Sequence, residues 1–220
     1  MMIDLTHTIS PDIPVYPGTP SPAVSSICTI TKDGFRESAL SITTHTGTHM
    51  DAPSHVTRHG STLDQLPVSQ FCGRAVVLDV SQTGPVVTAE FLKEHHDSLY
   101  CADFLLLYTG WEKRWGTAEY LEDAYPVFDE EAARYLLSCG LKGVGTDAIS
   151  VDRIGGPLTA HQIFLGDGMV IIECLCLKKV ADRKDFLFYA LPIKVDGADG
   201  APVRAIADLR ENNEKERRKP

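Results

Sequence analysis

The sequence predicts an α/β protein whose single domain spans residues 1–209. From Arg74 onward, apolar runs of strand length alternate with segments of helical periodicity, which is typical of an α/β layer. The chain has 220 residues, and 43% of them are hydrophobic, which is enough for one sizeable core. Residues 210–220 contain no large hydrophobic side chain, so we expect a charged, disordered tail there.

The elements follow in order along the chain. The first part is rich in Pro, Thr, Ser and Gly and has short strand-like stretches at 3–5, 25–30 and 40–44. The alternating part predicts strands at 75–80, 104–108 and 142–145, with helices at 88–96 and 130–139. A short helix at 159–165 and strands at 169–173, 186–195 and 203–208 complete the domain.

The helix at 130–139 has the clearest ends. Asp129 precedes it and can accept hydrogen bonds from the first backbone N–H groups. Gly140 follows it and allows a left-handed stop. We expect its apolar face to pack on the sheet.

Charge and hydropathy exclude several partners. Lys and Arg number 21 against 30 Asp and Glu, a formal charge of −9, which disfavours a nucleic-acid binder. No apolar run approaches the roughly 18 residues of a membrane span, and the first residues lack the order of a signal peptide. We therefore expect a cytoplasmic protein that acts on a small molecule, with no membrane partner. The six cysteines form no Cys-x-x-Cys pair, so we expect most of them to be core residues.

The segment 45–55 carries the most chemical information. It places His45, His49, Asp51 and His55 at odd positions, which project to one side of an extended chain. Full extension would separate His45 from His49 by about 13 Å, too far for easy convergence. Gly47 permits a bend and Pro53 ends regular pairing. We therefore predict a kinked strand running into a loop, which gathers the four side chains.

This donor set predicts a metal site. Nitrogen and carboxylate donors together suit zinc, manganese or ferrous iron better than calcium or magnesium. The alternative is a polar strand whose histidines make ordinary hydrogen bonds. The chain has eight histidines, and three of them within eleven residues, in register with an aspartate, favour the metal site.

The pattern His-x-Gly-Thr-His-x-Asp-Ala-Pro-x-His resembles the signature of the cyclase family of metal-dependent hydrolases, which includes bacterial kynurenine formamidases and isatin hydrolases. The resemblance extends to residues 4–6, 13–18, 109–111, 145–152 and 161–173, and covers residues 3–210. It implies a swivelling β/β/α single domain with a mixed sheet flanked by helices. It also implies a homodimer or homotetramer.

The resemblance assigns roles to particular residues. It implies that His45, His49 and Asp51 hold one metal, and that Asp51 bridges to a second ion held by His161 and Glu173. His55 matches the histidine assigned as general acid/base. From the residues alone, His161 could equally lie on a helix surface and Glu173 could pair with a lysine. The expected cofactor is zinc or manganese, with one or two ions per chain.

Other positions are less specific. Asp147 and Asp152 match family positions, and we expect them to be structural turn residues. Tyr16, Trp111 and Trp115 are candidates either for an aromatic-binding pocket or for the core. Two departures from the family pattern, Thr19 after the Tyr-Pro-Gly opening and Cys174 after Glu173, fall at positions that are not ligands.

These features predict a metal-dependent hydrolase of a non-peptide C–N bond, either in an aryl formamide or in a small cyclic amide. The alternative is a non-catalytic metal-binding or sensor protein that uses the same residues as a closed site. An exchangeable water on the metal would distinguish the two. A cysteine hydrolase using Cys72 or Cys101 has no recognisable local signature.

Overall fold

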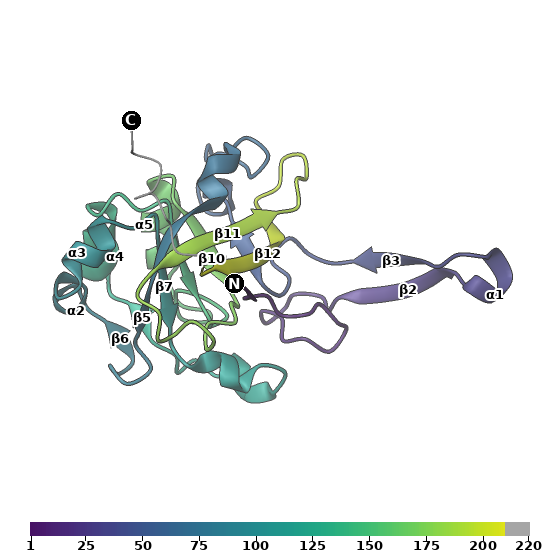
Figure 1. The fold of residues 1–220 in the computed structure, drawn as a ribbon, viewed down its shortest axis with the longest axis horizontal. Coiled ribbons are helices and arrows are strands. Elements are labelled where there is room, and N and C mark those ends of the chain that lie inside the picture. Colours follow the sequence, from purple (N-terminus) through teal and green to yellow (C-terminus); the bar gives the residue numbers. More distant parts are fainter. Residues whose placement is uncertain (210–220) are drawn as a thin grey trace.

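A computed structural model describes residues 1–209, so the predicted tail at 210–220 lies outside the described residues. The predicted α/β class and mixed sheet are confirmed, and the main sheet also closes into a barrel (Figure 1). Around the barrel the strand order is β12-β11-β5-β7-β9-β10-β4, and β4 pairs again with β12. The strands are β1 (Met2–Asp4), β4 (His49–Asp51), β5 (Cys72–Asp79), β7 (Phe104–Tyr108), β9 (Gly143–Thr146), β10 (Val170–Glu173), β11 (Phe186–Pro192) and β12 (Gly200–Asp208).

Strand β12 makes the closure possible because it is long enough to pair with two strands along one edge. Its first residues pair with β4, with Gly200 opposite Asp51, and its last residues pair with β1, with Asp208 opposite Met2. The neighbouring pairs β5–β7, β7–β9 and β9–β10 are parallel, whereas the pairs of β11, β12 and β4 are antiparallel. Closure leaves β4, which carries half of the predicted metal motif, hydrogen-bonded on both sides.

Apolar side chains cover both faces of the parallel strands. In β7, Phe104 and Leu106 point into the barrel core with Phe188 of β11, while Leu105 and Leu107 pack against the outer helices. A strand buried on both faces reads as a continuous apolar run, as β7 does. The helices are α1 (Ile30–Asp33), α2 (Ala89–Lys93), α3 (His96–Tyr100), α4 (Glu130–Leu137) and α5 (Thr159–Gly166).

Helix α4 confirms the predicted ends. The Asp129 side chain accepts a hydrogen bond from the Ala132 N–H at 2.7 Å, and Gly140 has a φ of 73°. The helix predicted at 88–96 is instead two short helices, because His95 has a non-helical conformation and separates α2 from α3. The other short elements are the pair β6 (Val86–Val87) and β8 (Val127–Phe128), and the 3₁₀ turns at Pro53–His55, Val68–Phe71, Trp111–Arg114 and Ala118–Leu121.

A hairpin projects from the body of the molecule (Figure 1). It consists of β2 (Ala23–Cys28), α1 and β3 (Glu37–Ser41), and we call residues 23–41 the arm. The strands predicted at 25–30 and 40–44 are therefore shifted toward the N-terminus, since α1 begins at Ile30 and β3 ends at Ser41. Among the described residues, no helix is long and apolar enough to cross a membrane.

Candidate metal centre

The predicted bend in the motif segment is present. Gly47 has a φ of 62°, a left-handed conformation that glycine adopts readily, and β4 begins two residues later. The extended part is shorter than predicted, because the strand covers only His49–Asp51 and Pro53 then starts a 3₁₀ turn that carries His55. The bend brings the His45 ring to within 5.1 Å of the His49 ring, measured between centroids.

Strand pairing and one helix bring the distant residues to the same place. Strand β10 pairs antiparallel with β4, so that Glu173 lies directly opposite His49. Helix α5 supplies His161, which is 3% exposed. His161 and Glu173 are therefore buried beside the motif and not exposed on a helix surface or paired with a lysine.

Four side chains converge around Asp51. The His45 Nδ1 atom lies 2.7 Å from Asp51 Oδ1, and His49 Nε2 lies 3.4 Å from the same oxygen. His161 Nε2 lies 3.6 Å from Asp51 Oδ2 and 3.4 Å from Glu173 Oε1. His49 Nε2 lies 3.5 Å from Glu173 Oε2. The structure thus brings together all five residues that the resemblance marks as ligands, and Asp51 lies at the centre of the group.

Backbone and carboxylate groups orient the two buried imidazoles. The Nδ1 atom of His49 faces the Gly47 carbonyl at 2.8 Å, and Nδ1 of His161 faces Asp152 Oδ2 at 2.7 Å. Each contact directs Nε2 of the same ring toward the carboxylates. Asp152 also accepts the N–H groups of Ala160 and His161, both at 3.0 Å, and so holds the first turn of α5.

Asp199 is a site residue that sequence reasoning missed. Its Oδ2 atom lies 3.1 Å from His45 Nε2 and 3.4 Å from His55 Nδ1. The neighbouring Gly200 permits this packing, because a Cβ built there would lie 2.6 Å from Cε1 of the His45 ring. Asp199 lies 144 residues from His55, and its local sequence carries no signal of a site.

The ionisable groups of the centre strongly perturb one another. Burial alone would lower the pKa values of His49 and His161, but the neighbouring carboxylates outweigh it and raise both well above their ordinary value. Burial alone would raise the pKa of Asp51, but the three surrounding histidines hold it well below its usual range. Without another cation, protons on these imidazoles compensate the buried carboxylates, so protons and a metal ion would compete for the same atoms.

The residues present fit a divalent metal ion. The buried Asp51 Oδ2 atom has no hydrogen-bond partner, which is costly unless a cation occupies its surroundings. Within residues 1–209, two groups each bring three ligand atoms within 4.8 Å of one another. They are His45, Asp51 and His55, and His49, Asp51 and Glu173. Both groups share Asp51, and neither contains a cysteine.

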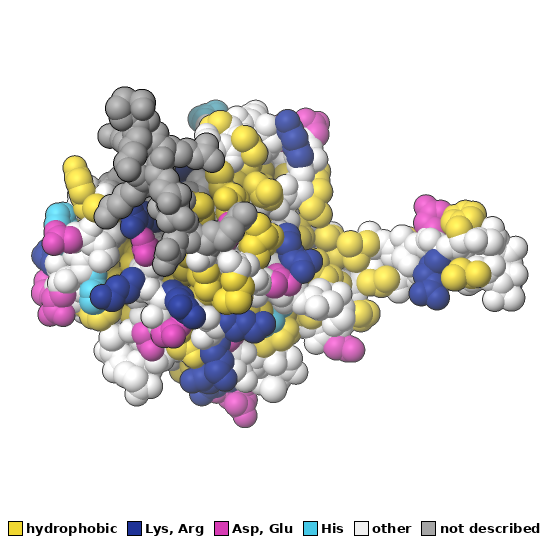
Figure 2. Space-filling view, viewed as in Figure 1, with side chains coloured by type: hydrophobic (Ala, Val, Ile, Leu, Met, Phe, Trp, Pro, Cys, Tyr) yellow, Lys and Arg dark blue, Asp and Glu magenta, His cyan; other side chains and the backbone are white. Residues whose placement is uncertain are grey.

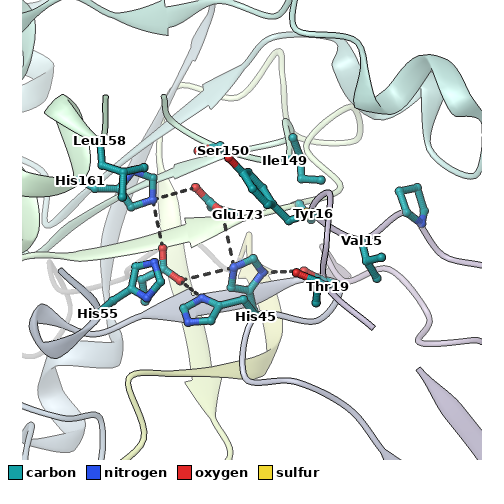
Figure 3. A pocket seen from close by; sticks show the side chains of 15 residues that line it. Val15, Tyr16, Thr19, His45, His55, Ile149, Ser150, Leu158, His161 and Glu173 are labelled. Carbon is teal, nitrogen blue, oxygen red and sulfur yellow. Dashed lines mark hydrogen bonds and ion pairs between the residues drawn. The ribbon is translucent and has the colours of Figure 1, made fainter. Parts of the chain in front are cut away.

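A cavity of about 250 Å³ opens beside this cluster. Figure 3 shows His45, His55, His161 and Glu173 on one side of it, with Val15, Tyr16 and Ile149 on the other. Thr19 and Cys174, the two departures from the family pattern, also line the cavity. A small apolar space with polar groups at one side is typical of a small-molecule site.

The remaining sequence candidates lie in different places. Trp111 is buried and packs against Tyr125, and Trp115 stacks on His7, so of the three aromatic candidates only Tyr16 lines this cavity. The Asp147 carboxylate accepts hydrogen bonds from the Thr109 hydroxyl and from the Thr109 and Glu112 backbone N–H groups. Burial raises the pKa of Asp147 to about 6.

Comparison with known proteins gives consistent matches along the chain. The family model described as "Putative cyclase" matches residues 3–153. A kynurenine formamidase of Salinibacter ruber is 34% identical over 212 residues, covering 93% of this chain and 96% of that protein. A kynurenine formamidase of Bacillus thuringiensis is 32% identical over 206 residues, covering 93% of this chain and 95% of that protein.

Solved structures agree with the sequence matches. An isatin hydrolase bound to the product analogue thioisatinate superposes with a TM-score of 0.85 at 26% identity, covering 94% of this chain and 91% of that one. Isatin hydrolase A from Labrenzia aggregata gives a TM-score of 0.83 at 28% identity, covering 94% and 93%. A structure described as a potential metal-dependent hydrolase with cyclase activity gives a TM-score of 0.74 at 30% identity, covering 94% and 96%.

Proposed function

Because the chain belongs to the cyclase family, we propose that it is a metal-dependent hydrolase that cleaves a non-peptide C–N bond in a small molecule. One observation carries the proposal. Three imidazoles and the Glu173 carboxylate gather around Asp51 beside an apolar cavity, and Oδ2 of Asp51 is buried without a hydrogen-bond partner.

We assign the ligand role to His45, His49, Asp51, His161 and Glu173. Zinc and manganese suit these donors, and one or two ions per chain are expected. The shared position of Asp51 in both ligand groups supports a bridging role. When bound, a divalent ion supplies Lewis acidity that polarises a substrate carbonyl and lowers the pKa of bound water toward neutrality.

We assign the general acid/base role to His55. Its side chain is 28% exposed and lines the cavity, so that a substrate can reach it. Its Nδ1 atom faces Asp199, which leaves Nε2 as the ring nitrogen that takes a proton from the attacking water and returns it to the departing nitrogen. Asp199 lies beside both His45 and His55 and orients the His55 ring.

The apolar wall of the cavity holds the rest of the substrate. Val15, Tyr16 and Ile149 offer a surface for an aromatic ring, and the volume of about 250 Å³ suits a small molecule. An aryl formamide is the first candidate, since the kynurenine formamidases share more sequence identity with the chain than the two isatin hydrolases do. A cyclic aryl amide such as isatin is the second candidate, because two isatin hydrolases superpose on the chain with TM-scores of 0.85 and 0.83.

The proposal is tested by assaying the metal-loaded protein with an N-formyl aryl amine and with isatin, following formate release and ring opening respectively. We expect His55→Ala to lower kcat by about 100-fold or more while the metal content stays unchanged. His59→Ala is the matched control, because His59 is exposed and does not line the cavity. Full activity of His55→Ala with metal bound would refute the role of His55, and loss of its metal would make it a ligand.

The cavity also favours an enzyme over the alternative, a non-catalytic protein with a closed metal-binding or sensor site. A closed structural site surrounds its metal with protein ligands, whereas here an open apolar space adjoins the ligands. Absence of turnover with either substrate class, together with no exchangeable water on the bound metal, would favour the alternative.

A further inference from the structure

Thr48 lies inside the metal motif, between the bend at Gly47 and the ligand His49. It is 2% exposed. Its hydroxyl donates to the backbone carbonyl of Cys174 at 2.6 Å and accepts the backbone N–H of His7 at 2.9 Å. One buried hydroxyl therefore joins three segments that are far apart in the sequence.

Cys174 needs such a contact because of its backbone conformation. Its φ of 56° is left-handed, and within residues 1–209 it is the one non-glycine residue with a positive φ. A residue with a Cβ atom is disfavoured there, so surrounding contacts must hold it in place. The Cys174 N–H donates to the Ala148 carbonyl at 2.9 Å, and the Thr48 hydroxyl holds the Cys174 carbonyl. Hydrogen bonds thus fix the turn at both of its peptide groups.

This turn adjoins both strands that carry predicted ligands. Strand β10 ends at Glu173, directly opposite His49 of β4, and Cys174 follows at once. The Nε2 atom of His49 lies 3.5 Å from Glu173 Oε2. The chain bends beside each of these ligands, at Gly47 and at Cys174. Because the Thr48–Cys174 hydrogen bond connects the two bends, it fixes how the two ligands face each other.

The turn also forms part of the cavity wall. Cys174 lines the cavity next to Glu173 and is itself 3% exposed. A shift of the turn would therefore move the wall and a ligand together. The contacts of the turn lie in the body of the molecule and involve no residue of the arm, whose apolar side chains Figure 2 shows. Contact of the arm with another molecule would neither make nor break them.

We propose that Thr48 is a positioning residue whose hydroxyl holds the left-handed turn at Cys174. Through this turn it sets the spacing of His49 and Glu173 and the place of the cavity wall. The inference rests on the proposed function in one respect, since it takes these two residues as metal ligands. The turn itself can be probed in the metal-free protein, so the two claims are tested separately.

The first measurement is the rate at which N-ethylmaleimide labels Cys174 in the metal-free protein, followed by peptide mass spectrometry. Thr48→Val keeps the shape of the side chain but leaves the Cys174 carbonyl and the His7 N–H without their partner. We expect labelling about 10-fold faster than in the wild type, because the turn opens more often. Thr48→Ser keeps the hydroxyl and should restore the wild-type rate. Cys139, which is buried just after α4, is the internal reference, and its labelling should not change.

The second measurement is zinc affinity, by competition with a chromogenic chelator. Thr48→Val should bind zinc about 10-fold more weakly than the wild type, and Thr48→Ser should bind it equally well. Thr88→Val is the matched control, because the Thr88 hydroxyl caps α2 by accepting the Phe91 N–H and does not line the cavity. It should lower the unfolding free energy but leave both Cys174 labelling and zinc affinity unchanged.

Several results would overturn the proposal. They are an unchanged rate of Cys174 labelling in Thr48→Val, equal acceleration of Cys174 and Cys139, or a failure of Thr48→Ser to restore the rate. Faster labelling with unchanged zinc affinity would overturn the link between the turn and the ligands. A wild type that binds no zinc or manganese would refute the proposed function instead, and the labelling rates would still decide whether Thr48 holds the turn.

Discussion

Removal of the Asp152 carboxylate should damage two things at once, the start of helix α5 and the orientation of His161. Asp152 accepts the backbone N–H groups of Ala160 and His161 and contacts the Nδ1 atom of the His161 ring. Leu158, at the N-cap of α5, provides no side-chain cap. Asp152→Ala would leave both N–H groups without their acceptor, at about 1–3 kcal/mol each, so we expect unfolding free energy to fall by about 2–6 kcal/mol.

The same substitution should also weaken metal binding, because it removes the contact that orients His161. The Asp152 contact fixes Nδ1 of that ring and directs Nε2 toward Asp51 and Glu173. Loss of such an outer carboxylate typically weakens metal binding by about 10- to 100-fold. Asp152→Asn keeps one oxygen acceptor. It should therefore lose metal affinity but lose less unfolding free energy than Asp152→Ala.

Two assays separate these effects. Urea denaturation of the metal-free protein gives the stability, and competition with a chromogenic chelator gives the metal affinity. Asp129→Ala is the control, because Asp129 caps α4 and no site residue contacts it, so it should cost about 0.5–2 kcal/mol and leave metal affinity unchanged. If Asp152→Ala and Asp152→Asn both bind metal as tightly as the wild type, His161 is not a ligand oriented by Asp152.

Two further substitutions test the packing and the electrostatics. Gly200→Ala should lower metal affinity by about 10-fold, because its Cβ would displace the His45 ring. Gly166→Ala is the control and should keep the wild-type affinity, because its added methyl group would meet no atom within 4 Å. Equal metal affinities of the two variants would refute the argument that Gly200 is needed for the close approach of His45. Burial raises the pKa of Asp147 from 3.8 to about 6, so its protonated form favours folding, and the stability it contributes is lost as pH rises from 4 to above 6. Over that pH range, the unfolding free energy of Asp147→Asn, measured by urea denaturation, should therefore rise by up to about 3 kcal/mol relative to that of the wild type. A difference in unfolding free energy that does not change with pH would contradict the burial effect.

The parts of the fold that the sequence predicted are those with local causes. Helix α4 was predictable because Asp129 and Gly140 fix its two ends within a dozen residues, and β7 because burial on both faces requires an unbroken apolar run. Closure of the barrel was not predictable, because β4 and β12 are some 150 residues apart and no local pattern marks their pairing. The arm was read as strands, but its projection from the body has no signature in the sequence.

The metal centre divides in the same way. The spacing of His45, His49, Asp51 and His55 in the sequence predicts a metal site, and Gly47 provides the bend. His161 and Glu173 needed the family resemblance, since nothing in α5 or β10 shows that they face β4. Neither the spacing nor the family resemblance identified Asp199, because its contacts with His45 and His55 form only when β12 closes the barrel.

Metal content is the most direct test of the central claim. Untagged protein, purified without chelator, should contain between one and two equivalents of zinc or manganese per chain by elemental mass spectrometry. Removal of the metal should abolish hydrolysis of an aryl formamide or cyclic amide, and the same ion should restore it. A protein that is metal-free as purified and takes up neither ion on addition would contradict the account.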